Sequence, residues 1–68
     1  MVNVKELQDH IDVIYELTGV QYVLRKDPVY GYKVCIQDMG NIMLFRGSLE
    51  KLNRQLANLE ASARYWAS

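Results

Sequence analysis

One cysteine and one histidine, Cys35 and His10, are the residues whose types most directly suggest chemistry. Nucleophilic catalysis needs a nucleophile, a base within hydrogen-bonding reach and a group that orients the base. The local patterns place His10 on a helix and Cys35 in a strand, and two ligands do not complete a four-ligand zinc site. We therefore expect no enzyme, no catalytic residue, no metal and no cofactor. The simpler interpretations are a small hydrophobic residue in a sheet for Cys35 and a solvated helix residue for His10.

A set of carboxylates forms a second distinctive group near the N-terminus. Residues 1–19 contain four acidic side chains and one lysine. Three of the acidic residues, Asp9, Asp12 and Glu16, fall on a helical stripe opposite the apolar residues of the same segment. Such a stripe can bind a basic partner surface. The alternative is an ordinary solvated helix face.

Basic and aromatic side chains gather around a predicted hairpin. Arg25 and Lys33 lie on its strands, and Tyr30 and Tyr32 flank it. Single-stranded nucleic acid is bound by this combination, because bases stack on rings while cations hold phosphates. The alternative is a hairpin whose exposed cations discourage edge-to-edge aggregation.

Aromatic residues are frequent, with five tyrosines and one tryptophan in 68 residues. Tyr and Trp are enriched at binding hot spots. Tyr30 lies in a turn with Pro and Gly, so it is the first candidate for a partner contact, and Tyr32 beside it is the second. The alternative for Tyr30 is a ring folded over the hairpin. Trp66 follows the apolar stripe of the last helix and is expected to cap the core.

Helical periodicity marks both ends of the chain. Asn3 with Glu6 resembles a capping box, and Gly19 is suited to end a helix, which predicts a first helix over 4–18. Ser48 is a plausible N-cap for a second helix of about 18 residues that begins near Leu49.

Between the helices the apolar period changes to two, which is typical of strands. We expect strands near 20–25 and 32–37, paired as a hairpin across the turn at 27–31. A third run, 42–45, is apolar on both faces and is predicted to be either the most buried strand or an interface strand.

These elements predict a single α+β domain over residues 1–68, in the order helix, three strands, helix. The expected architecture is a three-stranded antiparallel sheet covered on one face by two helices. The expected core combines the two helical stripes with alternating strand residues: Val4, Leu7, Ile11, Ile14, Leu49, Leu52, Leu56, Leu59, Val20, Tyr22, Leu24, Val34 and Ile36.

Composition limits the classes of function. The formal net charge is zero, which gives no whole-molecule attraction to nucleic acid or to a membrane. No segment has the features of a secretory signal or a membrane span, so we expect a cytoplasmic protein, in the producing cell or its host. A chain this short builds a marginal core, and its surplus of apolar residues predicts a homodimer.

The order of elements is similar to that of a double-stranded-RNA-binding domain. That family contacts phosphates with a basic cluster at the start of its second helix. At the start of the corresponding helix this chain has a leucine, Leu49, and an acid, Glu50, and its only cations there are Lys51 and Arg54. In that family's site, only Lys51 and Arg54 of this chain could contribute, and the nucleic-acid hypothesis combines them with Arg25 and Lys33 of the hairpin.

The segments Gly31-Tyr32-Lys33-Val34 and 47–52, in so small a chain, resemble the accessory proteins of bacteriophages and prophages. That resemblance implies a protein that binds and blocks a host protein such as a defence nuclease. The preferred hypothesis is therefore a non-catalytic protein-binding module with a host or self protein as partner. The alternative is a small nucleic-acid-binding domain.

Overall fold

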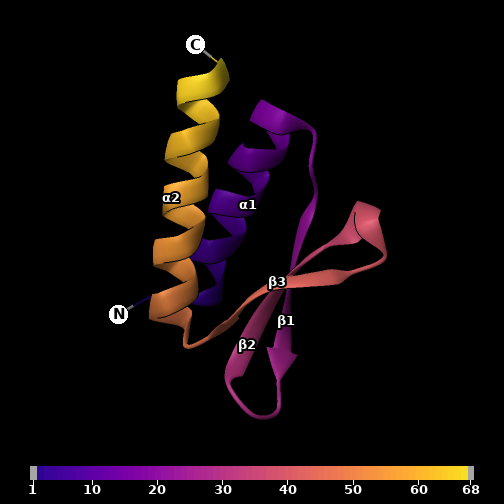
Figure 1. Ribbon diagram of the computed structural model, residues 1–68. Coiled ribbons are helices and arrows are strands. Elements are labelled where there is room, and N and C mark those ends of the chain that lie inside the picture. The colour runs from indigo at the N-terminus through magenta and orange to yellow at the C-terminus, as the bar shows by residue number, and fades with distance from the viewer. Residues whose placement is uncertain (1, 68) are drawn as a thin grey trace.

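The computed structural model describes residues 2–67 and has the predicted α+β architecture (Figure 1). Its elements in chain order are helix α1 (Val4–Thr18), strands β1 (Tyr22–Asp27) and β2 (Gly31–Ile36), the short 3-10 helix η1 (Gln37–Met39), strand β3 (Ile42–Gly47) and helix α2 (Leu49–Ala67). Both helices lie side by side on the same side of the sheet. The predicted order of elements and the one-sided cover of the sheet are confirmed.

Local signals set the two ends of α1. The Asn3 side-chain oxygen accepts a hydrogen bond of 3.0 Å from the Glu6 backbone N–H. Gly19 adopts the left-handed conformation with φ 76° and donates its N–H to the Tyr15 carbonyl at 2.7 Å. The backbone N–H and C=O groups at the ends of a helix have no partner within it, and these two bonds satisfy one at each end. The helix therefore spans the predicted residues.

The sheet is antiparallel with the strand order β1-β2-β3, so β2 is the central strand. Leu24, Val34 and Phe45 lie across from one another on the three strands and belong to the core or pack against it. The register between β2 and β3 shifts after the pair Val34 and Phe45: the next residue of β2, Cys35, is opposite Met43 and not opposite Leu44. Leu44 is therefore an extra residue of β3, a β-bulge.

The core lies between the helices and the sheet. Its buried cluster comes from both helices and the central strand: Leu7, Ile11, Ile14, Val34, Leu52 and Leu56. The expected core needs three corrections. Val20 and Ile36 are only half-buried and lie outside the cluster, and Val4 is 45% exposed. Val2 packs against the cluster instead. It precedes the N-cap Asn3, which is the position of the first residue of a hydrophobic staple.

Two further expectations about burial are wrong. Trp66 is 83% exposed and does not cap the core, because α2 is four residues longer than α1 and its last turn extends past the end of α1 (Figure 1). β3 is not the most buried strand, because it is an edge strand and its first three residues, Ile42, Met43 and Leu44, are 39–51% exposed. Whether β3 is an interface strand stays a prediction.

Candidate functional site

The face of the sheet opposite the helices, here called the outer face, combines charged and apolar side chains. Successive side chains of a strand point to opposite faces, so the neighbours of core-facing Leu24, Val34 and Phe45 point outward. The residues that the register places on the outer face are Val23, Arg25, Asp27, Lys33, Cys35, Met43 and Arg46.

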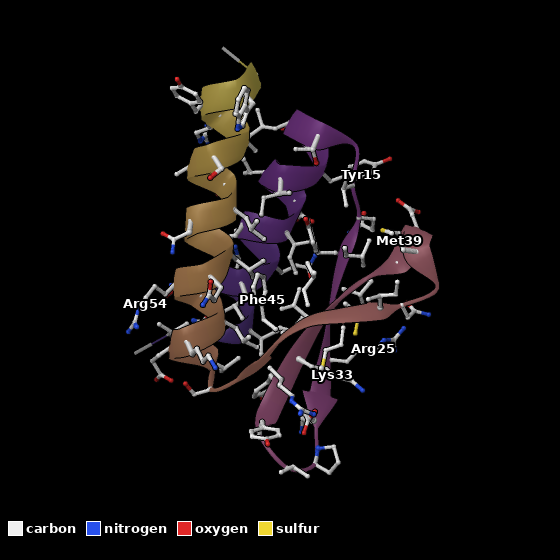
Figure 2. The ribbon with its side chains drawn as sticks, in the orientation of Figure 1. Tyr15, Arg25, Lys33, Met39, Phe45 and Arg54 are labelled. Atoms are coloured by element: carbon white, nitrogen blue, oxygen red, sulfur yellow. The ribbon has the colours of Figure 1, made fainter. Side chains whose placement is uncertain are left out.

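Three cations cross the outer face in one row, one from each strand. Arg25 is directly opposite Lys33, and Lys33 is directly opposite Arg46. We call these three residues the basic row. In Figure 2, Arg25 and Lys33 project from the sheet away from the helices. The ion pairs found among residues 2–67 involve none of the three. Like charges directly opposite each other destabilise a sheet, so the basic row has a local cost. The contact of Arg46 with the Tyr30 ring and the nearby Asp27 carboxylate offset part of it.

Tyr30 extends the basic row to the β1–β2 turn. The Arg46 guanidinium carbon lies 4.3 Å from the centre of the Tyr30 ring, which is cation–π geometry. Tyr30 is 50% exposed. The ring therefore holds the Arg46 side chain in place at the end of the row, and one of its two faces is already covered.

Asp27 shapes the turn beside the row. Its Oδ1 accepts hydrogen bonds from the backbone N–H groups of Val29 at 2.8 Å and Tyr30 at 2.9 Å. These bonds, the one from Tyr30 first, lower the pKa of Asp27 below its ordinary value, and the positive charges of Arg46 and Lys33 contribute less. Asp27 is therefore chiefly a structural residue of the turn, an Asx-type cap.

Apolar side chains lie next to the basic row. Cys35 is opposite Val23 on one side and Met43 on the other, and it is 3% exposed. Met43 is 41% exposed, and the bulged Leu44 is 39% exposed. A partner that covers this half of the outer face would bury apolar area beside three positive charges.

The cations predicted from the sequence do not form one site. Arg25 and Lys33 come together as expected, but Lys51 and Arg54 lie on α2. Figure 2 shows Arg54 on the far side of α2 from Arg25 and Lys33. Arg46 was missed, although it is the single charged residue of an apolar strand. Its place opposite Lys33 depends on the bulge at Leu44.

The two tyrosines predicted to bind a partner have different surroundings. Tyr30 is on the turn beside the outer face, whereas Tyr32 is half-buried and packs against the core. Tyr32 therefore contributes to the core, and the structure gives it no place on the outer face.

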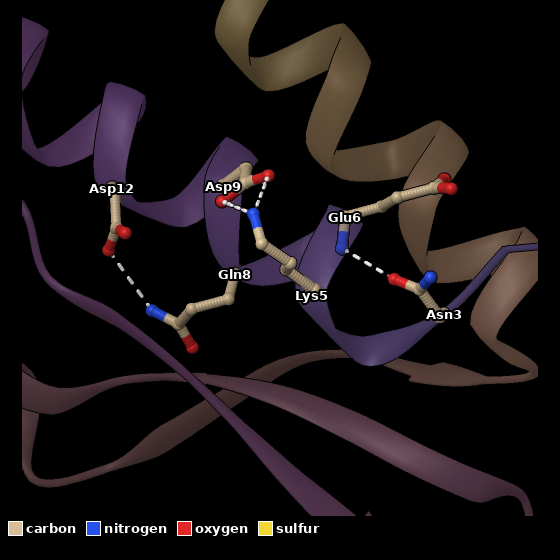
Figure 3. A network of polar contacts seen from close by, with 6 residues as sticks. All are labelled: Asn3, Lys5, Glu6, Gln8, Asp9 and Asp12. Carbon is tan, nitrogen blue, oxygen red and sulfur yellow. Dashed lines mark hydrogen bonds and ion pairs between the residues drawn. The ribbon is translucent and has the colours of Figure 1, made fainter.

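The predicted acidic stripe is exposed on α1, and two of its three members have partners on the same helix (Figure 3). Lys5 Nζ lies 3.1 Å from Asp9 Oδ2, and the Gln8 amide donates to Asp12 Oδ1 at 3.1 Å. No ion pair found among residues 2–67 includes Glu16. Because Lys5 offsets the charge of Asp9, the stripe is less negative than its sequence suggests.

His10 links the two helices and is not a solvated residue. Its Nδ1 lies 2.8 Å from Glu60 Oε1, and Arg64 donates to the other oxygen of Glu60 at 3.1 Å. The hydrogen bond with His10, followed by the one with Arg64, lowers the pKa of Glu60. The side chains of His10 and Glu60 are 27% and 20% exposed, so the pair is partly shielded from water. This arrangement stabilises the packing of α1 on α2.

Comparison with known proteins found no relative: no protein family, no curated protein and no solved structure matches the chain. Within residues 2–67, no helix is long and apolar enough to cross a membrane. The same residues contain no group of three or more His, Cys, Asp or Glu side chains placed to hold a metal ion.

Proposed function

We propose that the protein is a non-catalytic binding module that recognises an acidic surface of a partner protein with the outer face of its sheet. The observation that carries this proposal is the basic row, in which Arg25, Lys33 and Arg46 are direct neighbours across three strands. Like charges held side by side depart from the rule for stable sheets, and such departures are expected at functional sites. An acidic partner would relieve the repulsion on binding.

The apolar residues beside the row favour a protein as the partner. Met43 and Leu44 are 41% and 39% exposed, and β3 has a hydrogen-bonded neighbour only on its β2 side within the part of the chain that is described. A protein can supply carboxylates for the cations and apolar side chains for β3, and an extended segment can add to the edge of the sheet. A host or self protein is compatible with this chemistry, and an inhibitory role would follow if the covered surface of the partner were its active site.

The experiment compares three baits in a nuclease-treated lysate of the organism that carries the gene: wild type, the double variant Arg25→Glu/Arg46→Glu, and Lys26→Glu. The double variant places Glu on both sides of Lys33, and the attraction to Lys33 offsets the loss of the Arg46–Tyr30 contact, so the variant is expected to keep its fold. Lys26 lies on the same strand but is opposite Tyr32, on the helix side.

We expect proteins that are captured by wild type and Lys26→Glu, quantified by mass spectrometry, and that are lost with the double variant. Tyr30→Ala should weaken capture without abolishing it, because the ring positions Arg46. Equal capture by all baits, or loss with Lys26→Glu as well, would contradict the assignment of the outer face.

The basic row also supports a second candidate, nucleic-acid binding, because phosphates could bridge the three cations. It is the less favoured of the two, since the neighbours of the row are aliphatic and Tyr30 offers a single open face for stacking. A gel-shift assay with single- and double-stranded oligonucleotides tests it. Phosphate-dominated binding should be strongest at about 50 mM salt and fade by about 200 mM. The absence of a shift at low salt would exclude it.

A further inference from the structure

An apolar groove opens between the ends of α1 and α2, away from the outer face. Its volume is about 310 Å³, and the residues that line it come from both helices and the start of β1, among them Ile14, Leu17, Tyr22, Leu59, Ala63 and Trp66. This volume lies at the lower end of the range for small-ligand sites, so the groove has room for about one aromatic side chain.

The lining of the groove suits an apolar occupant. None of the lining residues is charged. Thr18, one of the polar ones, has a hydroxyl that already donates to the Ile14 carbonyl at 2.8 Å and accepts from the Val20 N–H at 3.1 Å. An aromatic ring could therefore enter the groove without burying an unpaired charge.

A ring of suitable size stands at the rim of the same groove. Trp66 is 83% exposed, and Tyr65 beside it is 73% exposed, with the two ring centres 5.5 Å apart in an edge-to-face arrangement. A protruding ring and a receptive groove thus occupy one surface. In a twofold-symmetric pair, each copy offers its ring to the groove of the other, which is the condition for an isologous interface.

We propose that the occupant of the groove is Trp66 of a second copy of this chain, so that the protein forms a symmetric dimer through the C-terminal ends of its helices. This inference does not involve the basic row and does not rest on the proposed function. Trp66 is the anchor residue of the interface in this dimer.

The area available fits a small dimer interface. A fully buried Trp or Tyr side chain covers about 150–250 Å². Four rings in two copies, each at least 73% exposed, supply roughly 450–800 Å². Each groove has room for about one ring, so its walls add less area than the rings do. The total of roughly 600–1,000 Å² is the size of a weak interface, which matches association in the high micromolar range. The small core of the single chain gives this burial a further role, because a 68-residue domain is marginal by itself.

The test measures association and the environment of the ring together. Trp66 is the only tryptophan, so fluorescence excited where tyrosine does not absorb reports on it alone. Sedimentation equilibrium should show the mass of wild type rising from one chain to two with concentration, up to the high micromolar range. The Trp emission should shift to shorter wavelength over the same range.

Two variants and a matched control locate the interface. Trp66→Ser removes the anchor, and Ser62→Arg places a charge in the groove; each should raise the dimer dissociation constant about tenfold or more, as hot-spot changes do. Ala61→Arg puts the same charge on the neighbouring exposed residue, which does not line the groove, and should leave association unchanged. Circular dichroism checks that each variant keeps its helices.

Three results would overturn the proposal. Wild type could stay a single chain at every concentration. A dimer could form that neither Trp66→Ser nor Ser62→Arg weakens, which would place its interface elsewhere, such as the edge of β3. The Trp emission could be at short wavelength already at the lowest concentration and independent of it, which would mean that the groove holds the ring of its own chain.

Discussion

Lys33 and Arg46 lie directly opposite each other on adjacent antiparallel strands, and Arg25 faces Lys33 from the other side. The lysine in the middle of the sheet is thus flanked by two positive charges at cross-strand distance. No helix covers this face, and Figure 2 shows Arg25 and Lys33 projecting from it. Arg46 is exposed as well, so a partner can reach the row. The proposed binding of an acidic partner depends on this relationship.

Removing the central charge should stabilise the fold. Lys33→Thr eliminates two like-charge contacts and introduces a residue that favours strands, so the free energy of unfolding should rise by about 0.5–1 kcal/mol. Urea denaturation at low salt measures the change, which should shrink at high salt because the repulsion is screened. Lys26→Thr, opposite Tyr32, is the control and should show no such salt-dependent gain. A loss of stability in Lys33→Thr would mean that the row does not repel itself.

The inter-helix carboxylate predicts a specific dependence on pH. The pKa of Glu60 is lower in the folded chain than its ordinary 4.5, so the unfolded chain binds more protons in this window. Stability is therefore present above the ordinary pKa and is lost as the pH falls through the folded pKa. Glu60→Gln should cost about 1 kcal/mol at neutral pH and flatten this part of the curve.

The measurement for Glu60 is urea denaturation followed by circular dichroism at a series of pH values across the carboxylate range. Glu16→Gln makes the same exchange at an exposed position of α1 and should leave the curve close to that of wild type. A Glu60→Gln curve as steep in acid as the wild-type curve would show that another group is responsible.

The β1–β2 turn should depend on the carboxylate of Asp27. Asp27→Ala removes the acceptor of two backbone N–H groups, at 2.8 and 2.9 Å, and should lower the temperature of unfolding. Asp27→Asn keeps a side-chain oxygen at the same place and should recover most of this loss. Thermal unfolding of the three proteins compares them, and equal losses in Ala and Asn variants would show that the acceptor oxygen is not what matters.

The same substitution should have different costs in the core and on β3. Leu56 is fully buried, so Leu56→Ala should cost about 2–5 kcal/mol. Leu44 is 39% exposed on the bulge of β3, so Leu44→Ala should cost less than about 1 kcal/mol. Urea denaturation measures both. Similar losses at the two sites would mean that β3 is buried in solution, for instance against a second copy.

Local signals were enough to predict the order of the elements and the bounds of the first helix. Asn3 and Gly19 act through hydrogen bonds to residues within one helical turn, so their effect can be inferred without the rest of the structure. The leucines of α2 were likewise placed by periodicity, although the side-chain burial of Trp66 depends on where α1 ends, which is a property of the assembled helix pair.

The candidate site was only half predictable, because it depends on register. Arg25 and Lys33 are close to a short turn, so their pairing follows from the hairpin. Arg46 is opposite Lys33 only because Leu44 is the extra residue of a bulge. No residue pattern in β3 predicts this bulge. Burial was misjudged where one residue competes with another, as where Val2 replaces Val4 in the core.

The most direct test of the central claim is the mapping of backbone amide shifts by NMR during titration with poly-L-glutamate, a defined source of carboxylates. The chain supplies its own control, since Lys51 and Arg54 are cations on α2, away from the outer face. We predict shift changes that concentrate at Arg25, Lys33 and Arg46 and disappear in Arg25→Glu/Arg46→Glu. Changes that are larger at Lys51 and Arg54, or that persist in the double variant, would contradict the assignment of the outer face as the binding surface.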